Sequence, residues 1–314
     1  MKYIFGFLVF IFSQLLLAQN PNSQNLEIND FIDGTLLQPE NSSSKTLAII
    51  IAGSGPTNRD GNQDIGKNNS LKMLAEFLAK EGISSFRYDK RIFKMAKSQT
   101  LDESKLRFDD FVKDAADVVN YFKLYHNEDY GFENYIFIGH SQGALIAELA
   151  SLKTAVNGLI LLCGTSQSID KILVSQIDKQ APFLTEDLKN ALDSISTAGY
   201  VNEYNPLLKT LLRKSVQPFM ASWMKYDPIE IAKKIDIPVL VVGGTTDIQV
   251  PAEEAEVFSK GFKNGNYVII ENMNHILKTI DDIGLENQKT YMNPNLPLSD
   301  GLKLELAKFL EKFK

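Results

Sequence analysis

Residues 135–143 read YIFIGHSQG, and the helix-forming sequence ALIAELA follows at residues 144–150. The apolar start predicts a buried strand that leads into a tight turn and then a helix. The serine at the centre of such a turn, Ser141, requires small residues two positions away, and Gly139 and Gly143 meet that requirement. An ordinary glycine-rich loop is the alternative. The strand before the turn and the helix after it favour a nucleophile raised above the edge of a sheet.

The remainder of the chain alternates between strand and helix patterns. Apolar runs typical of buried strands lie at residues 46–52, 83–89, 158–163, 238–244 and 267–271. Helical periodicity lies between them and at the end of the chain, at residues 71–81, 108–126 and 301–314. We therefore expect an α/β protein with a mostly parallel, doubly wound sheet. A hairpin is expected at residues 26–39, with Asp33 and Gly34 in its turn.

Residues 166–235 differ from this pattern, with helical patterns at 169–179, 185–196 and 206–224 and no clear strand. We interpret this segment as a helical cap inserted between the two parts of the core, residues 19–165 and 236–314. Phe183, Phe219 and Trp223 are candidates for an acyl pocket beneath the cap. The alternative is that these side chains form the cap's own core.

A serine hydroxyl needs a base, and the chain has three histidines. His126 ends the helix that leads into the strand at residue 135, so it belongs at the opposite end of the sheet from Ser141. His140 adjoins Ser141, and neighbouring side chains diverge in a tight turn. His275 follows the strand at residues 267–271, at the carboxyl edge where sites of open α/β sheets gather. His275 is therefore the predicted base.

The base needs an acidic partner, and the oxyanion needs backbone donors. Asp247 follows the strand at residues 238–244 and is the predicted acid, with Glu271 as the reserve candidate. The Gln142 amide, at the start of the helix, is one predicted oxyanion donor. The Ser54 amide is the other, with Gly55 second, because this glycine-rich loop follows the strand at residues 46–52.

Composition excludes several classes of protein. The net charge is -6 and no long basic run occurs, so nucleic-acid binding is not expected. Cys163 is the single cysteine, which rules out an intramolecular disulfide, and its apolar surroundings predict a buried, inert thiol.

The N-terminus resembles a targeting signal. Lys2 precedes an apolar segment that reaches Leu17, and Ala18 is a candidate cleavage position. Ser13 and Gln14 interrupt the segment, which favours a signal peptide at residues 1–18 over an uncleaved membrane anchor. We therefore expect an exported protein with no stable membrane span after cleavage.

With these residues in place, the chain resembles an α/β-hydrolase, and more narrowly the bacterial carboxylesterases and serine aminopeptidase-like hydrolases. The resemblance rests on five motifs: GSGPTNRDG at 53–61, RYDKR at 87–91, GHSQG at 139–143, GGTTD at 243–247 and Asn-His at 274–275. It implies acyl-ester hydrolysis through an acyl-enzyme and says little about the substrate. Our hypothesis is an exported serine esterase that acts on small-molecule esters of small or medium acyl groups and needs no metal or organic cofactor. Members of this group often follow the Asp-Lys-Arg run with Gly-x-Gly, whereas Ile-Phe-Lys stands at residues 92–94 here.

Two other functions remain open from the sequence. A peptidase or amidase would need an acidic cap residue that captures a substrate amine, for which Glu186, Asp187 and Glu203 are candidates. A non-catalytic binding protein with a hydrolase fold is the other, although a binding protein has no use for a complete triad.

Overall fold

A single eight-stranded sheet forms the centre of the computed structural model, which describes residues 22–40 and 44–314. Its spatial order is β1-β2-β4-β3-β5-β6-β7-β8. The pairs β1/β2 and β2/β4 are antiparallel, and all other neighbours are parallel. The strands are β1 (Ser23–Asn29), β2 (Ile32–Leu37), β3 (Thr46–Ile51), β4 (Ser84–Tyr88), β5 (Asn134–His140), β6 (Gly158–Leu162), β7 (Val239–Gly244) and β8 (Gly265–Ile270). The predicted mostly parallel sheet is confirmed.

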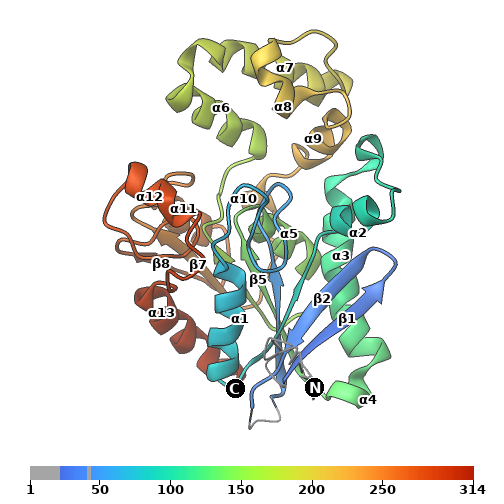
Figure 1. Cartoon of the computed structure of the whole chain (residues 1–314), viewed down its shortest axis with the longest axis vertical. Helices are drawn as coiled ribbons and strands as arrows, with labels where there is room; N and C mark the ends of the chain where they lie inside the picture. The colour runs from blue at the N-terminus through green and yellow to red at the C-terminus, as the bar shows by residue number, and fades with distance from the viewer. Residues whose placement is uncertain (1–21, 41–43) are drawn as a thin grey trace, which may run out of the picture.

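Helices cover both faces of the sheet (Figure 1). One face carries α1 (Ser70–Lys80) and α13 (Asp300–Leu310). The other carries α3 (Phe108–Asn120), α5 (Gln142–Ser151), α10 (Pro228–Ala232) and α11 (Glu254–Ser259). Further helices lie in the connections: α2 (Arg91–Lys97), α4 (Asn127–Tyr130) and α12 (Leu285–Thr290).

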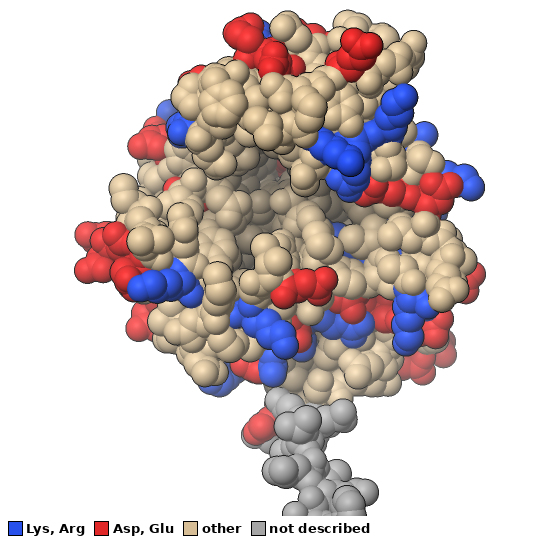
Figure 2. Space-filling model, turned by 45° about the horizontal axis from the view of Figure 1, so that its top comes forward, with Lys and Arg blue, Asp and Glu red and all other residues tan. Residues whose placement is uncertain are grey.

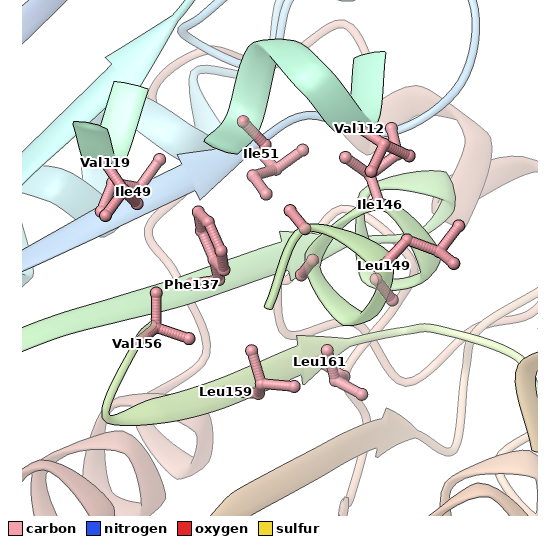
Figure 3. Close-up of a cluster of buried hydrophobic side chains, with 14 of the residues drawn as sticks. Ile49, Ile51, Val112, Val119, Phe137, Ile146, Leu149, Val156, Leu159 and Leu161 are labelled. Atoms are coloured by element: carbon pink, nitrogen blue, oxygen red, sulfur yellow. The ribbon is translucent and has the colours of Figure 1, made fainter. Parts of the chain in front are cut away.

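The buried strands supply side chains to both layers, because successive residues of a strand point to opposite faces. On β3, Ile49 packs beneath α3 and α5 while Ile50 packs on the opposite face; on β5, Phe137 and Ile138 divide in the same way. All four are at most 1% exposed. Figure 3 shows the layer on the α3 and α5 face, where Phe137 lies among side chains of the neighbouring strands and of these two helices. This double burial explains why the strands read as continuous apolar runs.

The hairpin turn predicted at Asp33 and Gly34 is wrong. The chain reverses at Asp30 and Phe31, and Gly34 lies inside β2. A Cβ added at Gly34 would lie 2.1 Å from the ring of Phe86 on the neighbouring strand β4. Glycine is required there so that an aromatic ring can pack closely, and not because the backbone turns.

Between β6 and β7 the chain forms helices and no strand in this fully described segment. These are α6 (Ile169–Gln180), α7 (Thr185–Ala198), α8 (Lys209–Leu212), α9 (Gln217–Trp223) and α10. The group α6 to α9 stands above the sheet edge in Figure 1 and has a separate apolar cluster that includes Leu188 and Ile195. We call this group the cap. The single helix predicted at residues 206–224 is wrong, since Arg213 adopts an extended conformation (φ -56°, ψ 143°) that separates α8 from α9.

No helix in residues 22–40 and 44–314 combines the length and apolar character that a membrane span requires. The predicted signal peptide at residues 1–18 lies outside the described residues.

Candidate active site

Ser141 lies in a strained turn between β5 and α5, with φ 53° and ψ -120°. A Cβ added at Gly139 would lie 2.2 Å from the carbonyl oxygen of Gly143, and one added at Gly143 would lie 2.3 Å from that of Ile51. Real side chains cannot approach so closely, so both glycines are required by packing. The turn sets Ser141 at the N-terminus of α5, where the helix presents unpaired amides and the positive end of its dipole.

The loop at residues 53–61, which follows β3, lies directly against this turn. A Cβ added at Gly53 would lie 3.2 Å from Cβ of Ser141. Within the described chain, neither the Ser54 amide nor the Gln142 amide donates to a protein acceptor. Both residues line the same cavity as Ser141. These are the two predicted oxyanion donors.

Asp247 and His275 lie past the ends of β7 and β8, and their side chains are hydrogen-bonded. His275 Nδ1 donates to Asp247 Oδ2 at 2.7 Å. The other oxygen of Asp247 accepts from the amides of Gln249 (2.8 Å) and Val250 (2.9 Å). The reserve candidate Glu271 is exposed and makes no hydrogen bond to His275 in the described structure.

The surroundings keep Asp247 ionised. Burial alone would raise the pKa of its carboxyl, but His275 and the amides of Val250 and Gln249 outweigh burial and hold that pKa below its usual value. An ionised Asp247 can only accept, so it favours the tautomer of the His275 ring whose proton is on Nδ1 and whose Nε2 is the acceptor. That tautomer is the one a general base requires.

His140 holds the backbone of His275 in place through a hydrogen bond. Its Nε2 donates to the backbone carbonyl of His275 at 2.7 Å, and the two ring centroids are 5.0 Å apart. Burial, followed by the nearby His275, lowers the pKa of His140 to about 4, so the His140 ring is neutral at physiological pH. Sequence reasoning set His140 aside as a base and gave no sign of this contact, which joins residues 135 positions apart.

Ser141 and His275 lie where two cavities meet. One cavity, of about 300 Å³, extends toward the 53–61 loop and Tyr291; the other, of about 310 Å³, extends beneath the cap toward Trp223. We call the first the polar lobe and the second the apolar lobe. Figure 2 shows the hollow under the cap lined by uncharged residues, with charged side chains around its rim.

Of the three predicted acyl-pocket residues, the structure places one in a cavity wall and two elsewhere. Trp223 lines the apolar lobe, together with Met220 of the same helix. Phe219 instead packs on Phe111 of α3, with ring centroids 5.5 Å apart, and does not line either lobe. Phe183 is 74% exposed at the connection between α6 and α7, so it does not form a pocket wall.

The RYDKR motif supports the 53–61 loop. Arg87 pairs with Asp60 (Nε to Oδ1, 2.8 Å) and Asp89 pairs with Arg59 (Oδ2 to Nη2, 2.7 Å). Lys90 is 5% exposed and donates to two carbonyls of the same loop. Sequence reasoning identified the motif without giving it this role, because the partners lie about thirty positions away. The helix α2 begins at Arg91, the last residue of this motif, and continues through residues 92–94, where related chains often have Gly-x-Gly.

One group of potential metal ligands is found in the described structure, formed by His140, Cys163 and His275, whose ligand atoms lie within 4.8 Å of one another. Burial, followed by the nearby Asp247, raises the pKa of the Cys163 thiol well above its usual value. The thiolate that a metal would require is therefore disfavoured. We assign no metal to this group.

Comparisons with known proteins identify the family and the fold. The family model described as serine aminopeptidase, S33, matches residues 67–279, more than half of the chain. Esterase EstD of Thermotoga maritima is 25% identical over 260 residues, which cover 78% of this chain and 58% of EstD. The chain thus spans little more than half the length of this curated relative.

Solved structures share the fold. Est1E from Butyrivibrio proteoclasticus has a TM-score of 0.59 and 19% identity, over 93% of this chain and 98% of that one. Proline iminopeptidase from Mycobacterium smegmatis has a TM-score of 0.54 and 14% identity, over 93% and 98%. At such identities the likeness establishes the α/β-hydrolase fold alone. The family match carries further, and the chain belongs to the serine aminopeptidase S33 family of α/β-hydrolases.

Proposed function

We propose that this chain is an exported serine esterase that cleaves carboxylic esters of small or medium acyl groups through an acyl-enzyme. The observation that carries the proposal is the shared position of Ser141 and His275 where the two lobes meet, with Asp247 bonded to the far nitrogen of His275. A scissile ester placed there would have one half in each lobe.

The reaction proceeds in two halves. The Ser141 oxygen bonds to the ester carbon while its proton passes to His275 Nε2, and the amides of Ser54 and Gln142 hold the resulting oxyanion. The alcohol then leaves with the proton from His275. Water attacks the acyl-enzyme with the same proton transfers in the same order, which releases the acid and restores Ser141. No metal or organic cofactor takes part.

An ester is favoured over a peptide by the lining of the site. The family includes aminopeptidases, which need a group that binds the substrate amine. None of the described residues that line the two lobes is Asp or Glu. The three acidic cap residues considered for this role, Glu186, Asp187 and Glu203, are exposed and line neither lobe.

The decisive experiment compares wild type with Ser141→Ala. We expect wild-type turnover of aryl esters, a loss of several powers of ten in kcat for the variant, and labelling of Ser141 alone by a fluorophosphonate. Unchanged turnover would overturn the assignment of the nucleophile. A folded wild type that is neither labelled nor active would favour a binding protein. Faster turnover of aminoacyl anilides than of aryl esters would favour a peptidase.

Export is tested separately, by expression of the whole chain in a bacterial host. We expect a mature protein that begins at Gln19 in the exported fraction, identified by N-terminal sequencing. A full-length protein that keeps Met1 in the membrane fraction would contradict cleavage and favour an anchor.

A further inference from the structure

The two lobes differ in chemistry although they are similar in size. The apolar lobe has the larger share of aliphatic and aromatic side chains, among them Leu145, Leu173, Met220 and Trp223, beside amide and hydroxyl groups such as those of Gln167 and Thr165. Such a surface gains free energy from burying an alkyl or aryl group. The acyl half of the ester belongs there.

Half of the residues that line the polar lobe, eight of sixteen, carry a hydroxyl or amide side chain. Its side chains include Ser54, Thr57, Gln63, Gln249 and Tyr291. None of the described residues that line it is Lys, Arg, Asp or Glu. An ionic group would therefore lose its hydration there without gaining an opposite charge.

Hydrogen bonds within the polar lobe leave specific atoms available to a ligand. Gln63 Nε2 donates to Thr57 Oγ1 (2.8 Å), which donates to the Ser54 carbonyl (2.8 Å), so Gln63 presents its carbonyl oxygen. Gln249 Nε2 donates to the Tyr291 hydroxyl (3.2 Å), so Tyr291 still has its own proton to donate. The lobe thus offers acceptors and donors, the pairing that a hydroxyl-bearing ligand satisfies.

We propose that the physiological alcohol is an uncharged polyhydroxyl group, a monosaccharide or a polyol of similar size, held in the polar lobe and esterified to an apolar acyl group. This inference rests on the proposed esterase function. A volume of about 300 Å³ lies at the lower end of ligand pockets, which limits the group to about one sugar ring.

The test uses four esters of one acyl group, butanoate, with ethanol, glucose, choline and glycolate as the alcohol. We expect kcat/KM for the glucose ester to exceed that for the ethyl ester by about tenfold or more, from two or more hydrogen bonds. The choline and glycolate esters should be no better than the ethyl ester. Equal rates for the glucose and ethyl esters, or a preference for a charged alcohol, would overturn the inference.

Variants locate the preference. Gln63→Leu and Tyr291→Phe should each lower the glucose-to-ethyl ratio of kcat/KM by about fivefold to tenfold. The matched control is Asn190→Leu, an exposed position on α7 that lines neither lobe, which should leave the ratio unchanged. If the glucose-to-ethyl ratio of kcat/KM is the same in all three variants and in wild type, the alcohol does not bind in the polar lobe and the inference is overturned. If wild type hydrolyses none of these esters and no aryl ester, the proposed esterase function is refuted. If it hydrolyses aryl esters but shows no preference for the sugar ester, only this inference is refuted.

A second, independent observation concerns Lys90. Its ammonium group is buried, donates to the carbonyl oxygens of Gly53 and of Gly55 (2.8 Å), and has no carboxylate partner in the described structure. Burial lowers the pKa of Lys90 to about 7. These two carbonyls flank Ser54, whose amide is a proposed oxyanion donor.

In a trans peptide the carbonyl and the following amide point in opposite directions. A carbonyl of Gly53 held by Lys90 on one side therefore fixes the amide of Ser54 on the other. We infer that Lys90 is a positioning residue that holds the Ser54 amide toward the oxyanion. The inference again rests on the proposed function.

Lys90→Met, which keeps an unbranched side chain one atom shorter and removes the donor, tests this role. We expect kcat to fall by about tenfold to a hundredfold, as for a misplaced oxyanion donor, with KM changed less than about twofold. Affinity for a trifluoromethyl ketone, which forms the oxyanion, should fall in parallel, while affinity for butanoate should not. The matched control is Lys278→Met, a second buried lysine that binds the carbonyl of Leu296 and should leave the ketone-to-butanoate ratio unchanged. A Lys90 variant that loses both affinities equally, or neither, would overturn the inference, whereas inactive wild type would refute the esterase.

Discussion

The Asp247 carboxylate and the His275 ring form a buried pair with an Oδ2 to Nδ1 distance of 2.7 Å and side-chain exposures of 1% and 5%. Two backbone amides hold the other oxygen of Asp247, so the carboxylate has little freedom to turn away. The pair therefore determines which nitrogen of His275 faces the cavity.

Asp247→Asn should lower kcat on aryl esters by about three to four powers of ten, because an amide in this position stabilises the wrong tautomer of His275. Glu271→Gln is the matched control, since Glu271 is exposed near the same histidine and should change kcat by less than twofold. Steady-state kinetics of the two purified variants decides between these acids. Strong loss in Glu271→Gln with an active Asp247→Asn would reverse the assignment.

The glycines around Ser141 should tolerate no side chain. Gly143→Ala would bring Cβ within 2.3 Å of the Ile51 carbonyl, a backbone atom that cannot move without shifting β3. We expect a loss of at least about 3 kcal/mol in the free energy of unfolding, or no soluble protein. At Gly284 the nearest atom would be 3.5 Å from an added Cβ, so Gly284→Ala should stay within about 1 kcal/mol of wild type in urea unfolding. A stable Gly143→Ala variant would contradict the tight turn.

Glu148, on the buried face of α5, should make stability fall as pH rises. The side chain is 0% exposed and neither oxygen has a partner in the described structure. Burial, followed by Asp227, raises its pKa well above 4.5. Above pH 4.5 the unfolded chain releases a proton that the folded chain keeps, so stability falls by about 1.4 kcal/mol per pH unit until the folded pKa is reached.

Glu148→Gln removes that titration. Its free energy of unfolding should exceed that of wild type at pH 7, and the difference should shrink steadily toward pH 4. Glu128→Gln, an exposed position on α4, should show no such trend. Chemical denaturation at several pH values measures both differences. A constant difference across pH would mean that Glu148 is ionised in the folded protein.

The sequence predicted the parts of the molecule that follow local rules. Strands buried on both faces appear in the sequence as apolar runs. The spacing of Gly139 and Gly143 around Ser141 predicts the tight turn. The proximity of Asp247 and His275 could be predicted because each follows a parallel strand, and parallel strands end at the same edge of the sheet.

Features that depend on packing between distant segments could not be predicted. The turn of the first hairpin was misplaced because Gly34 serves the ring of Phe86, which no local pattern reveals. Phe183 is a pocket candidate from the sequence because it lies in the predicted cap, but the path of the chain between α6 and α7 exposes it to solvent. The support of the 53–61 loop by Lys90 joins positions 35 and 37 residues apart.

The attachment of the cap to the core should depend more on one buried hydroxyl than on an ion pair. Ser222 is 3% exposed and accepts from the amide of Phe108 at 2.7 Å, which satisfies an unpaired donor at the start of α3. Ser222→Ala should cost about 1–2 kcal/mol, because that amide stays buried without a partner. Arg213 and Glu103 also join cap and core, but their side chains are 39% and 35% exposed, so Glu103→Gln should cost less than about 1 kcal/mol and less still in 1 M salt. Urea unfolding of both variants checks the order, and a larger loss in Glu103→Gln would show that the ion pair is the stronger link.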